Sequence, residues 1–163
     1  MRVLFDTNIV LDVLLNRQPH VATAAKLMAY VHDKRIDGLL GATTLTTVHY
    51  LAAKTVGTAR ARKHIVTLLS LFEVAAINRV VLAGALALPF RDFEDAVLHE
   101  AARHAGATGI LTRNAKGFAG SALTFYAPDE LLRLVSALSM IDPMPARGRS
   151  ADRSMPRTFI RVP

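Results

Sequence analysis

The chain has 163 residues, of which 52% are hydrophobic and none is cysteine, so it can build one domain with a core but no disulfide or thiolate metal site. Its apolar residues come in short runs, and acids interrupt the apolar N-terminus. We therefore expect no membrane span, no secretory leader and a cytoplasmic location. The net charge of +7 suits a polyanionic partner, although it would serve solubility equally well.

The first predicted element is a short strand at Val3–Phe5, an apolar run typical of strands buried on both faces of a parallel sheet. Asp6, Thr7 and Asn8 follow it directly, before a helix that begins near Ile9. Asp6 therefore lies at the carboxyl end of a strand, where open α/β sheets bind their ligands. Its carboxylate either caps the helix or belongs to a site.

Strand and helix patterns alternate along the rest of the chain. Further strands are predicted at 39–40, 73–77, 108–112 and 123–126. Helices are predicted at 9–15, 20–34, 43–55, 58–72, 78–88, 92–104 and 128–138. This alternation indicates an α/β fold with a mainly parallel sheet and helices on both faces.

Several of these helices begin beside residues that cap helices well. A threonine at 43 or 44, Thr58, Asn78 and Asp92 are each expected to cap a helix with a side-chain oxygen. Asp92 and Asp95 lie three positions apart at one helix start, so they share a face. Each acid alone is explained as well by capping or by the helix dipole as by a site.

The strand ends nevertheless suggest that acids from distant segments meet. In a parallel sheet, the strands at 3–5 and 108–112 can both direct their carboxyl ends at the helix start near Asp92, which would gather Asp6, Asp92 and Asp95. Two carboxylates ~4 Å apart repel by about 4 kcal/mol at an effective dielectric near 20. Such a group takes up a proton or a hard divalent cation, and on a basic protein a cation there favours phosphate chemistry.

Three motifs resemble those of PIN-domain nucleases of the PilT N-terminus-like branch, which includes toxins of the VapC type. They occur in the family's order, and the resemblance extends over residues 1–138. The motifs are Phe5–Asn8 after a strand, Phe93–Ala96 at a helix start, and Leu111–Asn114 followed by Lys116–Phe118. The resemblance implies a three-layer α/β/α PIN-like fold over residues 1–140, followed by a basic tail at 141–163 that we expect to be flexible.

The same resemblance implies an endoribonuclease that depends on Mg²⁺ (or Mn²⁺). It also implies the toxin of a toxin–antitoxin pair, a homodimer and a partner antitoxin. By position, Asp6 and Asp95 correspond to metal ligands, Asp92 to a nearby acid, and Asn114 stands where many relatives carry a fourth acid; these four form the implied catalytic set. The implied substrate contacts are Thr7, Asn8, Thr47, Arg113 and Lys116.

One position departs from the family pattern. Relatives usually place a carboxylate on the helix after the second strand, in a pattern like Thr-x-x-Glu, but here Thr44 is followed by Thr47, and no acid occurs from 43 to 55. Threonine is a poor metal ligand. The alternative interpretation is therefore a catalytically weakened PIN-like module that acts by RNA binding or protein–protein interaction.

Two basic segments, a tail and a cluster between two helices, have more than one possible role. The tail carries five arginines against two aspartates, a net +3 that leaves +4 for the body. In the body, a basic cluster marks the end of one helix and the start of the next, and consists of Lys54, Arg60, Arg62 and Lys63. It is either a solvated helix start or a contact for an RNA backbone. His99, four positions after Asp95, is expected to pack rather than to act in the site.

Overall fold

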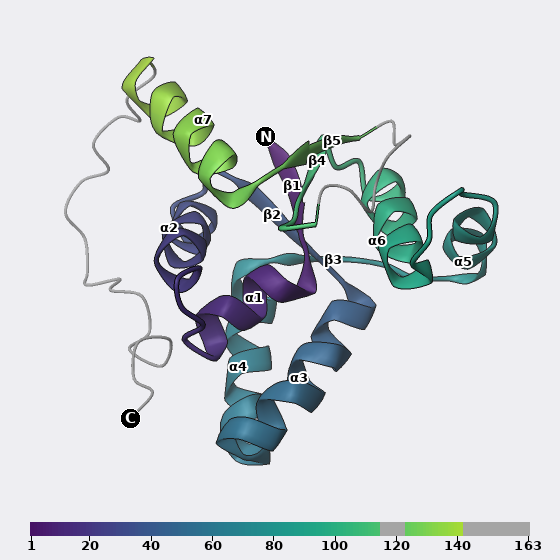
Figure 1. The fold of residues 1–163 in the computed structure, drawn as a ribbon, viewed down its shortest axis with the longest axis horizontal. Helices are drawn as coiled ribbons and strands as arrows, with labels where there is room; N and C mark the ends of the chain where they lie inside the picture. Colours follow the sequence, from purple (N-terminus) through teal and green to yellow (C-terminus); the bar gives the residue numbers. More distant parts are fainter. Residues whose placement is uncertain (115–122, 142–163) are drawn as a thin grey trace.

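Five short strands and seven helices make up residues 1–114 and 123–141, the part of the chain that the computed structural model describes (Figure 1). The strands are β1 (Arg2–Phe5), β2 (Asp37–Gly41), β3 (Glu73–Ala75), β4 (Gly109–Leu111) and β5 (Thr124–Tyr126). The helices are α1 (Thr7–Leu14), α2 (Val21–His32), α3 (Ala42–Val56), α4 (Thr58–Leu71), α5 (Arg79–Leu86), α6 (Phe93–His104) and α7 (Pro128–Ile141). Lys116 and the segment 142–163 lie outside the described residues, so the predictions made for them stay predictions.

The strands form one sheet in the order β3-β2-β1-β4-β5. Every pairing is parallel, and the central strand β1 aligns Leu4 with Leu39 of β2 on one side and with Ile110 of β4 on the other. The sheet is thus entirely parallel, which confirms and sharpens the expectation of a mainly parallel one. Strands of three to five residues suffice because apolar side chains on both faces are covered by helices.

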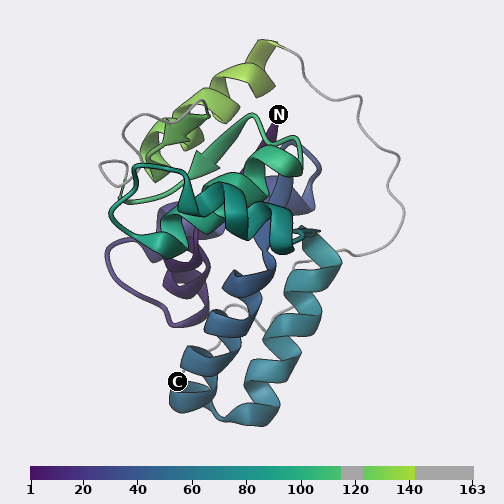
Figure 2. The same cartoon turned by 90° about the vertical axis from the view of Figure 1, so that its right-hand side faces the viewer.

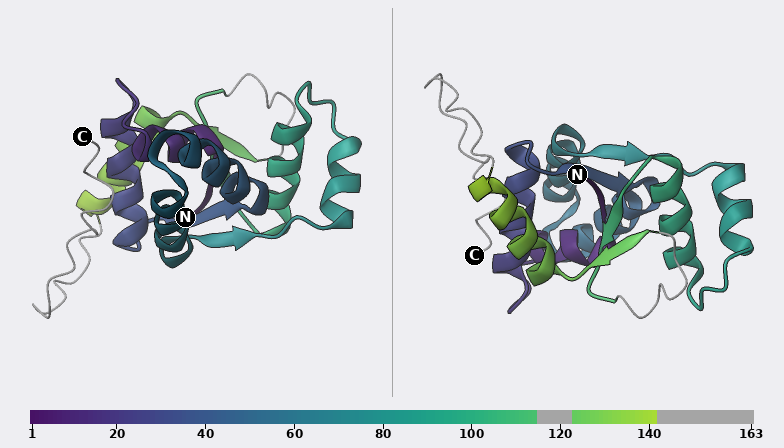
Figure 3. Two further views of the ribbon diagram at one scale, coloured as in Figure 1. Left: turned by 90° about the horizontal axis from the view of Figure 1, so that it is seen from below. Right: turned by 90° about the horizontal axis from the view of Figure 1, so that it is seen from above.

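Successive side chains of β1 point to opposite faces of the sheet and belong to two separate hydrophobic clusters. Val3 and Phe5 belong to a cluster with residues of α1, α2, α3, α4 and α7, whereas Leu4 belongs to a cluster with residues of α5 and α6. The views along the sheet show α5 and α6 on one side and α2 and α7 on the other (Figure 3). The three-layer α/β/α arrangement is therefore confirmed.

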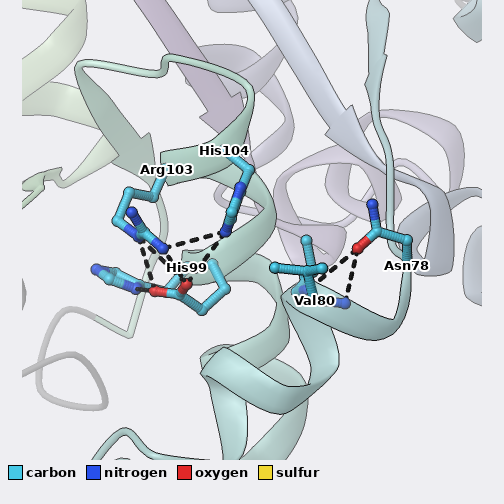
Figure 4. Close-up of polar contacts among 7 residues, drawn as sticks. Asn78, Val80, His99, Arg103 and His104 are labelled. Atoms are coloured by element: carbon cyan, nitrogen blue, oxygen red, sulfur yellow. Dashed lines mark hydrogen bonds and ion pairs between the residues drawn. The ribbon is translucent and has the colours of Figure 1, made fainter.

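The helix starts bear out two of the four predicted caps. Asn78 accepts hydrogen bonds from the amides of Val80 and Val81 (Figure 4), and Asp92 accepts one from the amide of Glu94. The threonine caps are wrong. Gly41 and Gly57 occupy the cap positions of α3 and α4, because α3 follows β2 without a linker and a single residue at φ +83° separates α3 from α4.

The α3–α4 pair forms a helical hairpin that projects away from the sheet (Figure 2). Its two helices pack side by side, while the first turn of α3 stays beside the end of β1 through a hydrogen bond between the hydroxyls of Thr7 and Thr44. The hairpin therefore has one end at the carboxyl edge of the sheet and its tip, around Gly57, remote from it. Within the described ranges, no helix is both long and apolar enough to cross a membrane.

Candidate active site

The carboxyl ends of β1 and β4 lie next to each other at the point where the order of the sheet reverses. From β1 the chain moves to β2 on one side, and it later returns to β4 on the other. The hydrogen bonds between β1 and β4 continue one residue past the end of β1, where the amide of Asp6 donates to the carbonyl of Leu111 at 3.0 Å. Such a switch point is where open α/β sheets form their ligand sites.

Asp6 is held at this point by a threonine from the neighbouring strand end. Its side chain is buried (6% exposed), and Oδ2 accepts a hydrogen bond of 2.9 Å from the hydroxyl of Thr112. The same hydroxyl accepts a hydrogen bond from the amide of Asn114 at 3.0 Å. Thr112 therefore links the Asp6 carboxylate to the loop that carries Arg113 and Asn114.

Asp6 also stands at the cap position of α1, where its side chain forms no cap hydrogen bond of standard geometry. Burial raises the pKa of Asp6, while the bond from Thr112 and the nearby amides of Asn8 and Thr7 offset part of the rise. A buried carboxylate with a raised pKa at a strand end is typical of a functional group.

The start of α6 brings a second carboxylate into range of Asp6. Asp95 is half-buried, and its side chain has no hydrogen bond or ion pair with any other described residue. Its pKa is raised to about 6, first by burial and then by the negative charges of Asp92, Asp6 and Glu94. The charge of Asp6, 89 positions earlier in the chain, thus acts on Asp95.

Asp92 caps α6 and also acts electrostatically on the acids at the start of that helix. Its Oδ1 accepts the amide of Glu94 at 2.8 Å, so half of the carboxylate is committed to capping α6. Its charge still raises the pKa values of Glu94 and Asp95. Asp92 therefore shapes the potential of the site, and its capping role is established by the geometry.

Sequence reasoning missed a buried acid, Asp12. It is fully buried on α1, neither of its carboxylate oxygens accepts a hydrogen bond from a described residue, and Nε of Arg113 lies 3.5 Å from Oδ2. Arg113 also lowers the pKa of Asp6. The guanidinium thus stands beside two buried carboxylates. The available signal was a single acid in an otherwise apolar helix, between Ile9 and Leu14.

The remaining predicted residues are spread around this edge. Thr7 is buried against Thr44, Asn8 is exposed, and Thr47 is half-buried one turn after Thr44 on α3, which contains no acid. Lys116 lies outside the described residues.

His99 packs as predicted, away from a catalytic role. Its ring is buried, lies edge-on to Phe90 and has Nδ1 3.4 Å from Glu100, on the part of α6 that also carries Arg103 and His104 (Figure 4). Burial lowers the pKa of His99.

The carboxylates suit a magnesium or manganese ion that keeps much of its water. No three or more His, Cys, Asp or Glu side chains of the described segments are arranged to hold a metal together, which rules out a closed protein cage within them. Asp6 and Asp95 remain, two hard oxygen ligands with raised pKa values. Mg²⁺ commonly uses one or two carboxylates plus waters, so these residues fit such an ion.

Comparisons with known proteins extend over most of the chain. The PIN domain family model matches residues 2–116. A toxin–antitoxin complex from Klebsiella pneumoniae is 25% identical, with 77% of this chain and 97% of that chain covered and a TM-score of 0.60. VapBC2 from Rickettsia felis, bound to a promoter DNA fragment, is 15% identical, with coverages of 77% and 98% and a TM-score of 0.58. VapC20 from Mycobacterium tuberculosis, described as a sarcin–ricin loop cleaving toxin, is 15% identical, with coverages of 75% and 98% and a TM-score of 0.59. No curated protein matches.

Proposed function

The chain belongs to the PIN domain family, and we propose that it is a Mg²⁺- or Mn²⁺-dependent endoribonuclease that acts as the toxin of a toxin–antitoxin pair. One observation carries the proposal. The half-buried Asp95 has no cationic partner among the described residues, yet it lies in the field of the buried Asp6 at the switch point of the sheet. Leaving such a group unpaired costs stability unless a ligand neutralises it.

Asp6 and Asp95 are the residues that would hold the ion. When bound, a divalent cation supplies a Lewis acid for a phosphoryl oxygen and lowers the pKa of a water molecule. Thr112 fixes the orientation of Asp6, as partners of metal ligands commonly do. The N-termini of α1 and α6 begin at Asp6 and Asp92, so two positive helix ends favour the phosphate of a substrate at this edge.

Residues around the acids are proposed to position the RNA. Arg113 offsets the repulsion between the carboxylates and an incoming phosphate, because it lies 3.5 Å from Asp12 and its charge reaches Asp6. Asn114 is proposed to complete the catalytic set with Asp6, Asp92 and Asp95, with Asp92 contributing only its charge. The other proposed substrate contacts are Thr7, Asn8, Thr47 and Lys116.

The toxin role and the partners are proposed from the similar structures. Two of them are a toxin–antitoxin complex and a VapBC assembly on DNA, and a third is described as an RNA-loop cleaving toxin. On this ground we propose an antitoxin protein as partner, and a homodimer as the assembled form.

A second function is favoured by one specific feature. Since α3 carries Thr47 and no acid, the site has fewer carboxylates than the family pattern provides. A module that binds RNA or protein without cutting would have the same fold.

The proposal is tested by cleavage of a structured RNA with purified protein. We expect cutting that requires Mg²⁺ or Mn²⁺ and that falls at least about 100-fold in Asp6→Asn, since even the partners of metal ligands are worth 10–100-fold. Asp33→Asn, which changes an exposed acid at the end of α2, is the matched control and should cut normally. An Asp6→Asn protein as active as the parent would contradict the proposal. Salt-sensitive RNA binding without any metal-dependent cutting would favour the non-catalytic alternative.

A further inference from the structure

The positive charge of the body is concentrated on the α3–α4 hairpin. No acid occurs between Asp37 and Glu73, and the hairpin carries four cations, which are Lys54, Arg60, Arg62 and Lys63. In the rest of residues 1–141, eleven lysines and arginines stand against eleven aspartates and glutamates. The hairpin therefore accounts for the whole +4 of this part of the chain.

These charges are free to meet a ligand. All four side chains are exposed, and none forms an ion pair with another described residue. Nζ of Lys54 lies 4.1 Å from the ring centroid of Tyr50, and Tyr50 is itself 59% exposed. We call these four cations with Tyr50 the hairpin tip; they lie on the second half of α3 and the first two turns of α4, on either side of the turn at Gly57. Figure 2 shows the two helices projecting from the sheet toward that turn.

The placement of Arg60 opposes the stability of α4. Arg60 lies in the first turn of the helix, where the dipole favours acids and disfavours cations, and Arg62 and Lys63 follow in the second turn. Arg60 also lowers the pKa of the buried His64. A solvated helix start chosen for stability would carry acids there, as α6 does with Glu94 and Asp95. The charges therefore point to a polyanionic ligand.

The geometry of α3 sets the distance between this surface and the candidate active site. Thr44, in the first turn of α3, hydrogen-bonds Thr7 beside Asp6, and Lys54 lies in the last turn. The ten residues from Thr44 to Lys54, at 1.5 Å each, span about 15 Å. At about 3.4 Å per nucleotide, a strand needs roughly four to five nucleotides to reach from one to the other.

We propose that the hairpin tip binds the phosphate backbone of the RNA substrate about 15 Å from the bond that is cut. The proposal rests on the proposed function for the identity of the ligand. The four cations neutralise phosphates without reading sequence, and Tyr50 offers a face on which an unpaired base can stack. The hairpin thereby selects for length and shape of the RNA, while the site at Asp6 performs the reaction.

The test compares two triple variants of the full chain that each remove three exposed charges. Arg60→Gln/Arg62→Gln/Lys63→Gln changes the hairpin tip, and Lys26→Gln/Lys34→Gln/Arg79→Gln is the control elsewhere on the surface. Binding to a labelled RNA of about 30–40 nucleotides is measured in EDTA over a range of salt. We expect the tip variant to bind at least about tenfold more weakly and its salt slope to fall by about 2–3, with the control within about twofold of the parent.

Equal losses in the tip variant and the control, or no loss in either, would overturn the proposal. So would duplex DNA that competes as well as the RNA does. Because binding is measured without metal, absence of cleavage would refute the proposed nuclease and leave this test intact. Folding is checked by melting, which the tip variant should not lower, since it removes unfavourable charges from a helix start.

Discussion

Two buried or half-buried carboxylates on α6, five positions apart, have opposite surroundings. Glu100 is 4% exposed and accepts hydrogen bonds from Arg103 at 2.7–3.2 Å, with His99 and His104 also in ion-pair range (Figure 4). The pKa of Glu100 is lowered, chiefly by Arg103. The charges that act on Asp95 are those of Asp92, Asp6 and Glu94, and together with burial they raise its pKa to about 6.

The comparison separates a structural carboxylate from the one that we propose binds a ligand. Glu100 obtains its cation, Arg103, from its own helix three positions further on, so it is neutralised as soon as α6 forms. Asp95 has Leu98 and His99 at those positions, and His99 lies against Glu100 and Phe90 instead. No described residue therefore neutralises the Asp95 carboxylate. In the proposed function, a metal ion supplies the missing positive charge.

Removing the charge of each carboxylate in turn gives the largest expected difference between them. We expect Asp95→Asn to lower RNA cleavage at least about 100-fold and to maintain or raise the melting temperature, because it removes repulsion among acids. Glu100→Gln should leave cleavage within a few-fold and lower the melting temperature by about 3–6 °C, because the ion pairs of the cluster are lost. Loss of cleavage in both variants alike would remove the distinction between the two carboxylates.

The pH dependence of stability sharpens the same contrast. The folded protein holds a proton on Asp95 up to about pH 6, whereas the unfolded chain releases it near 3.8. The folded state binds more protons in that window, so the contribution of Asp95 to stability falls as pH rises from about 4 to about 6 and stays low above it. Glu100, whose pKa is lowered, stabilises the fold at neutral pH and loses that effect as pH falls through its folded pKa.

Magnesium should offset the loss of stability that ionised Asp95 causes, because the ion binds the ionised carboxylate. In thermal melts, about 10 mM Mg²⁺ is expected to raise the melting temperature by several degrees at neutral pH and by much less near pH 5. Asp95→Asn should abolish the difference between the two pH values. An increase of the same size at both, in the parent protein, would contradict a site built on Asp95.

The smallest expected effect concerns the acid that α3 lacks. Thr47 is half-buried one turn beyond Thr44, which contacts Thr7 at the site. Thr47→Glu should tighten Mn²⁺ binding by about 3–10-fold, because affinity for hard cations grows with the number of charged ligands. Titration calorimetry measures the change, with Thr46→Glu, on an exposed position of the same helix, as the control. Equal effects of both variants would mean that Thr47 does not face the ion.

The layout of the fold and the meeting of the ends of β1 and β4 were predictable from sequence. Short apolar strands alternate with helices, and parallel strands place their carboxyl ends at one edge, so the residues that follow β1 and β4 had to be neighbours. The PIN-like motifs mark the same segments. These inferences depend only on backbone geometry and on the burial of apolar runs.

The partners of individual side chains could not be predicted from the sequence. The Asp12–Arg113 pair joins residues about a hundred positions apart, and no local pattern encodes it. The hydroxyl of Thr112 turns toward Asp6 because the two strand ends are adjacent, which only the assembled sheet determines. The two threonine caps failed for a related reason, since the lengths of the connections at Gly41 and Gly57 decide which residue precedes each helix.

The central claim is that Asp6 and Asp95 share a divalent cation. A crystal soaked in Mn²⁺, with its anomalous scattering measured, tests this directly. The account predicts a peak between the two carboxylates, completed by water and absent from Asp6→Asn crystals. A peak at another place, or carboxylates that stay apart with no ion between them at high Mn²⁺, would contradict it.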